Sequence, residues 1–356
     1  QIAPLSKIDS DLHILYTPLH GTGGRFVPDV LRAAGFTHVK TVKEQMVPDG
    51  NFPTVQSPNP EEAASFQMAF QYAEEASFDI ILATDPDADR VGTAVRHSGE
   101  WVLLNGNQVG ILLADFILQQ LPESNRKKAV VIKTIVTSEM IEPIAEKYGV
   151  EVMNTLTGFK YIGALIDVLD QQGKEFVFGF EESYGYLAGT AVRDKDAVLA
   201  SLLIVQAAAY YKERGLTLVE RLDELMEEHG YYLEGLKSYS FSSSMEAERA
   251  KAFITRLRAK PISSIADEKV IAVLDYGESI RFDLDTGETS PIHLPKEDVL
   301  QWITQEGSKI TLRPSGTEPK MKLYFGVRGR KREEAERRLW EIEQASDALV
   351  RSGLKE

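Results

Sequence analysis

The stretch Ile80-Ile81-Leu82-Ala83-Thr84-Asp85-Pro86-Asp87-Ala88-Asp89-Arg90 passes directly from an apolar segment into an acidic one. Its first half is a short continuous apolar run, which is typical of a strand buried on both faces. Its second half carries a carboxylate at every second residue, and in an extended segment alternate side chains point to the same side. We therefore predict a buried strand over 78–83 that ends in a loop with three aspartates.

The three aspartates of this loop have the chemistry of a magnesium site. Without a partner, carboxylates this close repel one another and raise each other's pKa. A hard divalent cation such as Mg²⁺ removes that penalty and prefers oxygen ligands. The loop also leaves the carboxyl end of a strand, where open α/β sheets bind their ligands. We therefore predict that Asp85, Asp87 and Asp89 bind one Mg²⁺.

Two known types of acidic loop fit this segment less well. An EF-hand loop counted from Asp85 requires Gly at its sixth position and Glu at its twelfth, where this chain has Arg90 and Arg96. A haloacid-dehalogenase-type phosphatase also places Asp-x-Asp after a strand, but usually continues with Thr or Val where Asp89 stands. A solvated acidic turn without a ligand remains open at this point.

Around this strand, the first two-thirds of the chain alternate short β-rich runs with amphipathic helical runs, as in parallel sheets covered by helices. A helix is expected to start at Asn59-Pro60-Glu61-Glu62, with Asn59 as its N-cap and Glu62 three residues after it. A helix after Gly24 should end at Gly35. Further strands are expected at 12–16, 129–135, 150–153 and 175–180, and further helices at 108–121, 138–148, 161–169 and 196–214.

From residue 230 the pattern changes to a helix at 245–258, several short strands between 270 and 327, and a charged helix from 330. This order is typical of an α+β domain. The sequence thus predicts two related α/β domains followed by a smaller α+β C-terminal domain. We expect the metal-binding loop in domain 1–102, a sugar-binding loop in domain 103–229 and a phosphate-binding loop in domain 230–356.

A second acidic loop, Gly179-Phe180-Glu181-Glu182-Ser183-Tyr184-Gly185-Tyr186, follows the strand at 175–180. Paired carboxylates at a strand end suit the vicinal hydroxyls of a sugar, since each carboxylate accepts hydrogen bonds from two donors. Lys160 and Lys195 add basic groups nearby in the sequence. On this segment alone, an ordinary helix-capping turn remains the default alternative.

A third loop, Leu312-Arg313-Pro314-Ser315-Gly316-Thr317-Glu318-Pro319-Lys320, lies between two expected strands. Arg313 offers a bidentate fork to a phosphate, and Ser315 and Thr317 offer hydroxyl groups. Gly316 lets backbone N–H groups come close to an anion. We predict a phosphate-binding turn, with a plain hairpin turn as the alternative.

The segment 17–24, Thr-Pro-Leu-His-Gly-Thr-Gly-Gly, is rich in glycine and precedes a helix, so its backbone N–H groups are candidates for a phosphate cradle. It matches neither the Walker pattern nor the dinucleotide fingerprint. A structural turn beside the site is the other interpretation. His20 is either a proton carrier or, as is commoner, a structurally satisfied histidine.

The bulk properties exclude several classes of protein. A formal net charge of −14 over 356 residues argues against a nucleic-acid partner, because a phosphate backbone would be repelled. The chain has no cysteine, so disulfides, thiolate nucleophiles and cysteine-ligated metals are excluded. No apolar run reaches the ~18 residues of a membrane-spanning helix. We expect a cytoplasmic protein without a membrane partner, either processed or cut from a longer chain because residue 1 is Gln.

In combination, the three loops resemble the α-D-phosphohexomutase family, the phosphoglucomutases and phosphomannomutases. The resemblance rests on Asp85-Pro86-Asp87-Ala88-Asp89-Arg90, Glu181-Glu182-Ser183-Tyr184-Gly185 and Arg313-Pro314-Ser315-Gly316-Thr317-Glu318-Pro319-Lys320, in this order. It covers essentially the whole chain, as the second, third and fourth domains of a four-domain family. Pro86 is more like the branch that holds bacterial phosphoglucomutases and phosphopentomutase-like enzymes.

The resemblance implies an intramolecular phosphotransferase, an isomerase that interconverts sugar 1-phosphate and 6-phosphate through a phosphoserine and a bisphosphate such as glucose 1,6-bisphosphate. It implies that Asp85, Asp87 and Asp89 hold Mg²⁺ and that Arg90 helps hold the transferring group. Lys160 and Lys195 match basic catalytic positions more loosely. The resemblance also implies that Glu181 and Ser183 contact the sugar. It implies that the non-reacting phosphate is bound by Arg313, Ser315, Gly316 and Thr317.

One departure from the family pattern is large. The family's first domain, with its Thr-Ala-Ser-His-Asn-Pro nucleophile loop, has no counterpart in these residues. Ser57-Pro58-Asn59-Pro60 imitates the end of that loop, but no histidine follows the serine, so we reject Ser57 as the nucleophile. We expect a fragment that is inactive alone and whose partner is the missing N-terminal domain. A non-catalytic sugar-phosphate-binding protein, a Mg²⁺-dependent phosphatase and a phosphopentomutase-like enzyme are the alternatives.

Overall fold

The computed structural model describes residues 11–315 and 319–355. The chain divides into two compact units, Gln1–Leu225 and Met226–Glu356. Among the described residues, no helix is both long enough and apolar enough to cross a bilayer. Each unit is described by itself below.

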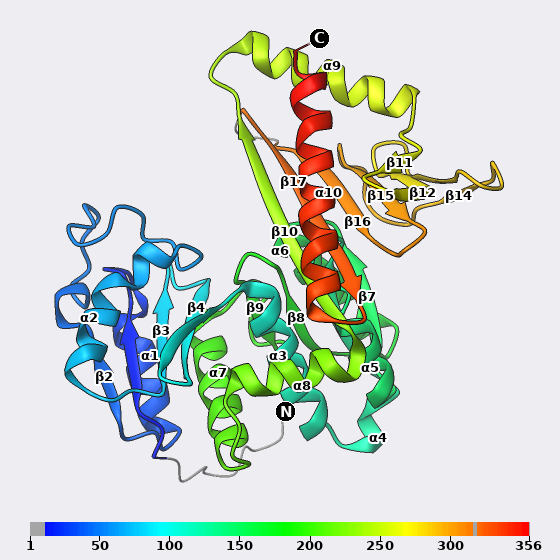
Figure 1. Ribbon diagram of the computed structural model, residues 1–356. Coiled ribbons are helices and arrows are strands. Elements are labelled where there is room, and N and C mark those ends of the chain that lie inside the picture. Colours follow the sequence, from blue (N-terminus) through cyan, green and yellow to red (C-terminus); the bar gives the residue numbers. More distant parts are fainter. Residues whose placement is uncertain (1–10, 316–318, 356) are drawn as a thin grey trace. The chain divides into compact units, whose positions relative to one another are not determined.

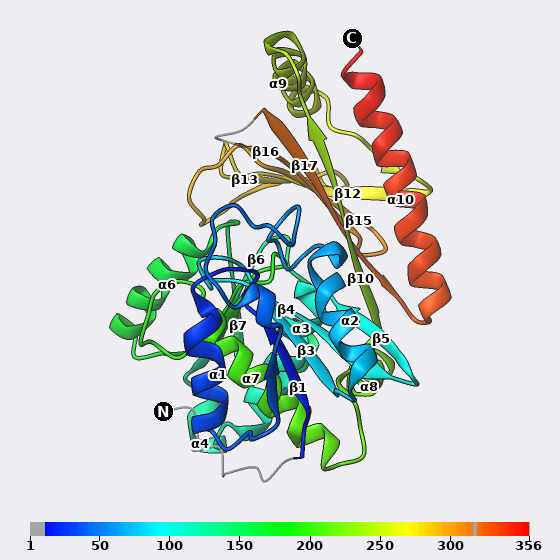
Figure 2. The same ribbon diagram turned by 90° about the vertical axis from the view of Figure 1, so that its left-hand side faces the viewer.

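The first unit opens with a sheet built around the strand that precedes the acidic loop. Its strand order is β2-β1-β3-β4-β5, with β1, β2 and β3 parallel and β4 and β5 antiparallel. Figure 2 shows the helices α1 and α2 on either side of the strands β1 and β3. The bounds are β1 Ile14–Thr17, α1 Gly23–Ala33, β2 Val39–Thr41, η1 Lys43–Gln45, η2 Ala63–Phe66, α2 Gln67–Glu75, β3 Ile80–Thr84, β4 Val91–His97 and β5 Glu100–Leu104.

A second sheet of the same unit has the strand order β7-β6-β8-β9, with β6, β7 and β8 parallel and β9 antiparallel. The helix α6 covers one face through Phe159, Ile162 and Ile166. The bounds are α3 Gly106–Gln120, α4 Glu123–Arg126, β6 Ala129–Thr134, α5 Ile141–Tyr148, β7 Glu151–Thr155, α6 Phe159–Gln171, β8 Glu175–Phe180, β9 Tyr186–Ala188, α7 Ala197–Lys212 and α8 Leu218–His229.

The two sheets repeat one plan. In each sheet, the last of the three parallel strands, β3 or β8, leads into an acidic loop. The chain then returns as an antiparallel neighbour of that strand, β4 or β9. The loops are far shorter than the dozen or more residues that a parallel crossover requires, so the returning strand must run antiparallel. The prediction of two related α/β domains is confirmed, although the sheets are mixed where we expected parallel strands.

The prediction that a helix begins at Asn59-Pro60 is wrong. Residues 59–62 form a turn, the 3₁₀ helix η2 follows, and the α-helix α2 begins only at Gln67. The Glu62 carboxylate accepts a hydrogen bond from Ser57 Oγ instead of reaching back to the N–H of Asn59, as a capping box would require. The Asn59 side chain caps only the turn, by accepting the N–H of Glu61.

The helix α7 is buried along most of its length and packs against α1, α3, β3, β4 and β9, so it joins the two sheets. Its N-cap is Asp196, whose Oδ1 accepts the N–H groups of Val198 at 2.9 Å and Leu199 at 3.0 Å. The N–H of Ala197 donates to the carbonyl of Ala88 in the acidic loop. The start of the helix that joins the sheets is therefore fixed directly to the predicted metal loop.

A buried carboxylate, Asp115 of α3, holds α5, α7 and α8 together. Its oxygens accept hydrogen bonds from Tyr211 at 2.7 Å, Tyr148 at 3.1 Å and Gln119 at 2.7 Å. Arg221 of α8 supplies the compensating positive charge, with Nη2 2.9 Å from Asp115 Oδ2. Because Asp115 is fully buried, this arginine balances a charge that has no access to water.

The second unit is an antiparallel sheet covered by two helices, as the sequence predicted for the C-terminal domain. Its strand order is β10-β17-β16-β15-β12-β13-β14, and β11 pairs with β12. Figure 1 shows α10 lying along this sheet, and Phe253 of α9 and Ile342 of α10 join its core. The bounds are β10 Tyr231–Ser240, α9 Ser244–Ala259, β11 Ser264–Ile265, β12 Glu268–Asp275, β13 Ile280–Asp283, β14 Thr289–Pro291, β15 Leu300–Thr304, β16 Lys309–Pro314, β17 Lys320–Gly329 and α10 Arg332–Gly353.

Replacing Arg221 by methionine should lower the free energy of unfolding of the first unit by about 3–5 kcal/mol, because the Asp115 carboxylate stays buried without its cation. The matched control is Arg351→Met, which removes an exposed pair with Asp347 and should leave the free energy of unfolding nearly unchanged. Urea unfolding of both variants and the wild type measures the two values. Equal losses in the two variants would contradict the structural role of Arg221.

Candidate active site

The acidic loop begins at Asp85, directly after β3, and gathers its carboxylates on one side. One oxygen from each of Asp85, Asp87 and Asp89 lies within 4.8 Å of the others. The N–H of Ala88 donates to the carbonyl of Asp85 at 3.0 Å, and Ala88 adopts a φ of 58°. This left-handed residue closes a tight turn, and the turn brings the three carboxylates together, where the sequence pattern predicted an extended segment.

Asp85 is the member of the group that organises the loop. Its side chain is only 1% exposed, and its Oδ1 accepts the N–H groups of Asp89 and Arg90, each at 3.0 Å. Its Oδ2 accepts Arg90 Nε at 2.7 Å. Burial raises the pKa of Asp85 to about 6, although the hydrogen bonds from Arg90 lower it.

This donor set fits a hard divalent cation. The three hydrogen bonds to Asp85 leave room in its carboxylate for a further contact, because an ionised carboxylate has about four lone-pair sites. Asp87 is exposed and Asp89 is half-buried, so the group opens to solvent on one side. Carboxylate oxygens around an accessible position are the ligands that Mg²⁺ prefers.

Arg90 is held from two sides. Its Nε contacts Asp85, and its Nη1 lies 2.8 Å from Glu61 Oε1 and 3.5 Å from Asn59 Oδ1. Nothing in the sequence pointed to Glu61, because its position in a helix-start pattern explained it locally. The arginine is therefore fixed in direction before any ligand arrives.

In the second acidic loop, Glu181 is 4% exposed and its Oε1 accepts the N–H of Gly158 at 2.8 Å. Burial, together with the neighbouring Glu182, raises the pKa of Glu181 to about 7. Ser183 is half-exposed beside it. Glu181 is therefore a carboxyl group that can hold or release a proton near neutral pH.

Glu182 ties this loop to the neighbouring strand. Its Oε2 lies 3.4 Å from the hydroxyl oxygens of both Thr134 and Thr137, at the carboxyl end of β6. Its carbonyl group packs against Gly106, where an added Cβ would lie 2.7 Å from the carbonyl carbon. The two adjacent glutamates thus have different surroundings.

The two acidic loops are in direct contact. Arg90 and Gly185 form an antiparallel β-bridge, and the N–H of Val91 donates to the carbonyl of Tyr184 at 3.2 Å. Each loop connects a parallel strand of its own sheet to the antiparallel strand that follows. The residues predicted to bind metal and sugar therefore belong to one continuous structure.

Lys195 joins the two loops through its side chain. Its Nζ lies 2.8 Å from Asp89 Oδ2, and it packs so closely on Gly185 that an added Cβ would be 2.9 Å from Lys195 Cγ. Burial lowers the pKa of Lys195, but the carboxylates around it, of which Asp89 is the main one, together outweigh burial and raise the pKa. Lys160, by contrast, is exposed in the first turn of α6, with its Nζ over the ring of Tyr161.

The predicted phosphate loop lies in the second unit. Arg313 is near the end of β16, opposite Lys322 of β17, and its Nε is 3.9 Å from Glu297 Oε2. The N–H of Ser315 donates to the carbonyl of Lys320 at 2.8 Å, which closes the hairpin. Gly316 and Thr317 lie outside the described residues.

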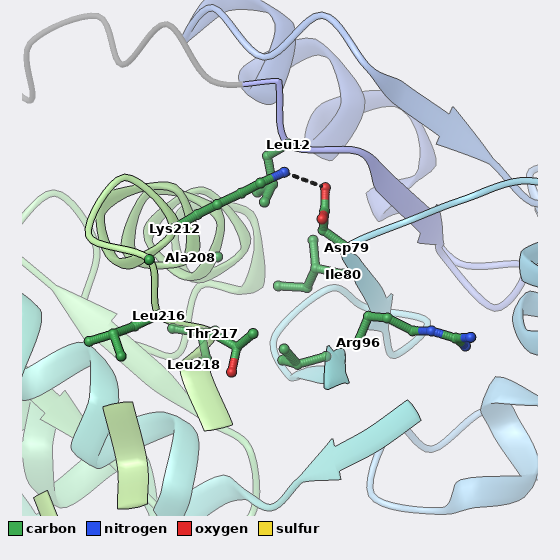
Figure 3. A pocket seen from close by; sticks show the side chains of 11 residues that line it. Leu12, Asp79, Ile80, Arg96, Ala208, Lys212, Leu216, Thr217 and Leu218 are labelled. Atoms are coloured by element: carbon green, nitrogen blue, oxygen red, sulfur yellow. Dashed lines mark hydrogen bonds and ion pairs between the residues drawn. The ribbon is translucent and has the colours of Figure 1, made fainter. Parts of the chain in front are cut away.

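A cavity of about 280 Å³ lies away from these loops, between the end of α7 and the start of β3. Figure 3 shows its lining, with Lys212 reaching Asp79 at 3.0 Å beside Ile80. Asp79 precedes β3 and Asp85 follows it, so the cavity and the acidic loop are at opposite ends of one strand. The cavity is not part of the candidate site.

Comparison with known proteins identifies the family. Residues 3–99 match the family model for phosphoglucomutase/phosphomannomutase, alpha/beta/alpha domain II, and residues 105–229 match that for alpha/beta/alpha domain III. The chain belongs to the α-D-phosphohexomutase family. The acidic loop lies in the part that matches domain II, and the Glu181 loop in the part that matches domain III.

Curated relatives of the chain include phosphoglucomutases of Staphylococcus aureus. That of strain USA300 is 39% identical over 320 residues, which are 90% of this chain and 57% of the relative. The phosphoglucomutase of strain MSSA476 is 39% identical over 322 residues, which are 90% of this chain and 58% of the relative. The chain thus spans somewhat more than half the length of these relatives.

Solved structures share the fold at low identity. A Paramecium phosphoglucomutase (parafusin) has a TM-score of 0.65 and 17% identity, covering 99% of this chain and 60% of that one. A phosphoglucomutase/phosphomannomutase family protein of Burkholderia thailandensis has a TM-score of 0.64 and 17% identity, covering 98% and 63%. The succession of two α/β domains and a C-terminal sheet domain is therefore that of the family.

The raised pKa of Glu181 predicts a pH dependence of stability. Between about pH 4.5 and pH 7 the unfolded chain has released this proton while the folded chain keeps it, so stability should fall as the pH rises. Glu181→Gln removes this loss and keeps an oxygen for the N–H of Gly158. From pH 5 to pH 8, the free energy of unfolding of the variant should rise by on the order of 2–3 kcal/mol relative to that of the wild type.

Urea unfolding at both pH values measures this gain. Glu175→Gln is the matched control, because Glu175 is exposed at the start of the same strand and stays in water in both states. It should follow the wild type. If the free energy of unfolding of Glu181→Gln changed with pH in parallel with that of the wild type, Glu181 would be ionised throughout the range from pH 5 to pH 8.

Proposed function

We propose that this chain provides the metal, sugar and phosphate loops of a phosphohexomutase that interconverts sugar 1-phosphate and sugar 6-phosphate. The observation that carries the proposal is the direct contact of the two acidic loops through the Arg90–Gly185 bridge and Lys195. A metal loop fused to a sugar loop suits an enzyme that moves a phosphoryl group on a sugar. A simple phosphatase does not require this fusion.

The comparisons support the substrate class. A structure of N-acetylphosphoglucosamine mutase from Aspergillus fumigatus, with a TM-score of 0.50 and 16% identity, is a complex with glucose 1,6-bisphosphate. That ligand has a phosphate at each end of one sugar. We propose that a bisphosphate of this kind is the intermediate and activator of the present protein.

Asp85, Asp87 and Asp89 would hold one Mg²⁺ in this proposal. When bound, the cation supplies a positive centre that stabilises charge on the transferring phosphoryl group. Arg90 adds a second, fixed positive group, because Asp85 and Glu61 set the direction of its guanidinium. Groups oriented in advance stabilise developing charge without reorganising during the reaction.

Glu181 would bind the sugar and hold a proton. Its Oε1 is used by the N–H of Gly158, so Oε2 is the oxygen available to a sugar hydroxyl. A carboxyl group with a pKa of about 7 accepts a proton from a hydroxyl and returns it at neutral pH. Ser183 would donate a second hydrogen bond, and Lys195 and Lys160 would add positive charge near the reacting phosphate.

The second unit would hold the phosphate that does not react. We propose that Arg313, Ser315, Gly316 and Thr317 form this cradle, which would hold the substrate by its non-reacting phosphate. The phosphorylated serine would belong to a part of the protein outside these 356 residues. Ser57 is not proposed as this serine, because the histidine that follows the serine in the family's nucleophile loop is absent after it.

Asp87→Ala in the full-length protein should lower kcat by about 10²- to 10³-fold, because it removes a ligand of the stabilising cation. Asp29→Ala, an exposed aspartate of α1, is the matched control and should leave kcat unchanged. A coupled mutase assay with glucose, mannose and ribose phosphates measures the rates and identifies the preferred sugar. Steady release of inorganic phosphate without isomerisation would instead indicate a phosphatase.

Arg313→Ala should act on binding. We expect KM for the sugar phosphate to rise roughly 10- to 100-fold with a smaller change in kcat, because a charged hydrogen bond to the phosphate is lost. Arg337→Ala, an exposed arginine of α10, is the control. An unchanged KM would remove Arg313 from the phosphate cradle.

A further inference from the structure

We propose that the loop formed by residues 17–24 positions the metal loop, and that His20 is the positioning residue that fixes its shape. This inference rests on the proposed metal site. It concerns the segment for which the sequence allows two interpretations, a phosphate cradle and a structural turn. The contacts favour the second and give the turn a definite target.

The backbone of this loop adopts an unusual conformation. Leu19 has a φ of 48° and His20 a φ of 64°, so two successive residues with side chains are left-handed. Leu19 is fully buried and His20 is 4% exposed. L-residues avoid this region, and such conformations persist only where the surroundings hold them.

A chain of hydrogen bonds, most of them partly buried, holds the His20 ring. Its Nδ1 lies 3.0 Å from the carbonyl oxygen of Val47, which only accepts, so Nδ1 carries the proton. Its Nε2 lies 2.9 Å from Thr54 Oγ1, which in turn accepts Gln45 Nε2 at 3.0 Å. Gln45 Oε1 accepts the Thr17 hydroxyl at 2.5 Å. Both ring nitrogens of His20 are thus engaged within the protein, and neither is left to carry protons to a substrate.

Three N–H groups of the loop are also used within the protein. Those of His20 and Gly21 donate to the carbonyls of Gln45 and Pro18, and that of Thr22 donates to the carbonyl of Pro86. These three groups therefore do not face an anion. This arrangement argues against the phosphate cradle.

The target of the loop is Pro86, which lies between two of the proposed metal ligands. Thr22 contacts the Pro86 carbonyl twice, through its N–H at 2.8 Å and its hydroxyl at 3.1 Å. Gly21 packs so closely that an added Cβ would lie 2.6 Å from the Pro86 oxygen. Gly23 similarly abuts Thr84, the last residue of β3. The strained turn thus supports the metal loop through its backbone, at the residue between Asp85 and Asp87.

The first test places a methyl group in this contact. Gly21→Ala introduces a Cβ that displaces Pro86, and we expect Mn²⁺, used as a probe for Mg²⁺, to bind about 10- to 100-fold more weakly, as when support for metal ligands is lost. Gly50→Ala is the matched control, since its added Cβ meets nothing within 4 Å. Electron paramagnetic resonance on the 356-residue chain measures free and bound Mn²⁺.

The second test acts on His20. His20→Ala removes the ring that holds the turn, whereas His20→Asn keeps an amide donor and acceptor and tolerates the left-handed conformation. We expect Mn²⁺ affinity to fall with alanine and to recover in part with asparagine. In the full-length protein, His20→Ala should lower kcat and leave KM for the sugar phosphate nearly unchanged, which a general loss of folding would not do.

The outcomes are distinct. If the wild-type chain binds no Mn²⁺, the proposed metal site fails and this inference fails with it. If the wild type binds Mn²⁺ and the Gly21→Ala and His20→Ala variants bind it equally well, the metal site stands and the positioning role of the loop is overturned. Circular dichroism of each variant at the temperature of the titration shows that the comparison is made between folded proteins.

Discussion

The structure of the candidate site depends on one buried carboxylate, Asp85. Its two oxygens accept three hydrogen bonds from its own loop, and these bonds turn the chain so that Asp87 and Asp89 face the same side. Placing a carboxylate at a position that is 1% exposed is unfavourable unless opposite charge compensates it. Arg90 supplies part of that charge, and Arg90 in turn contacts Glu61 and the neighbouring acidic loop.

The duplicated plan of the first unit explains why the two acidic loops meet. Each sheet sends a parallel strand into a short loop that must return antiparallel, and α7 packs against strands of both sheets. The loops then lie edge to edge and continue the β pairing through Arg90 and Gly185. A repeated architecture thus produces one site from two loops of different chemistry, an aspartate loop and a glutamate loop.

The strands and the loop residues that follow them were predictable because both signals are local. An apolar run followed by alternating aspartates specifies β3 and the Asp85 loop, and the β8 bounds agree with the prediction at both ends. The partners of these loops were not predictable, because they come from distant segments. Glu61 and Arg90 are 29 positions apart, and Thr22 and Pro86 are 64 positions apart. At Asn59, the local capping pattern predicted the start of a helix. The Asn59 side chain instead accepts the N–H of Glu61 in a turn and contacts the distant Arg90.

The charges around the site follow from the same constraint. The aspartates of the first loop and the glutamates of the second lie together in a chain whose net charge is already −14, and Arg90 and Lys195 contact the acidic loop as cations. A site with excess carboxylates attracts a divalent cation but repels a sugar phosphate. In the proposed metal site, a bound divalent cation would reduce this excess of negative charge, and Lys195, which contacts Asp89 and packs on Gly185, lies where the two acidic loops meet. The proposed function therefore depends on a cation that offsets part of this negative charge when an anionic sugar phosphate binds.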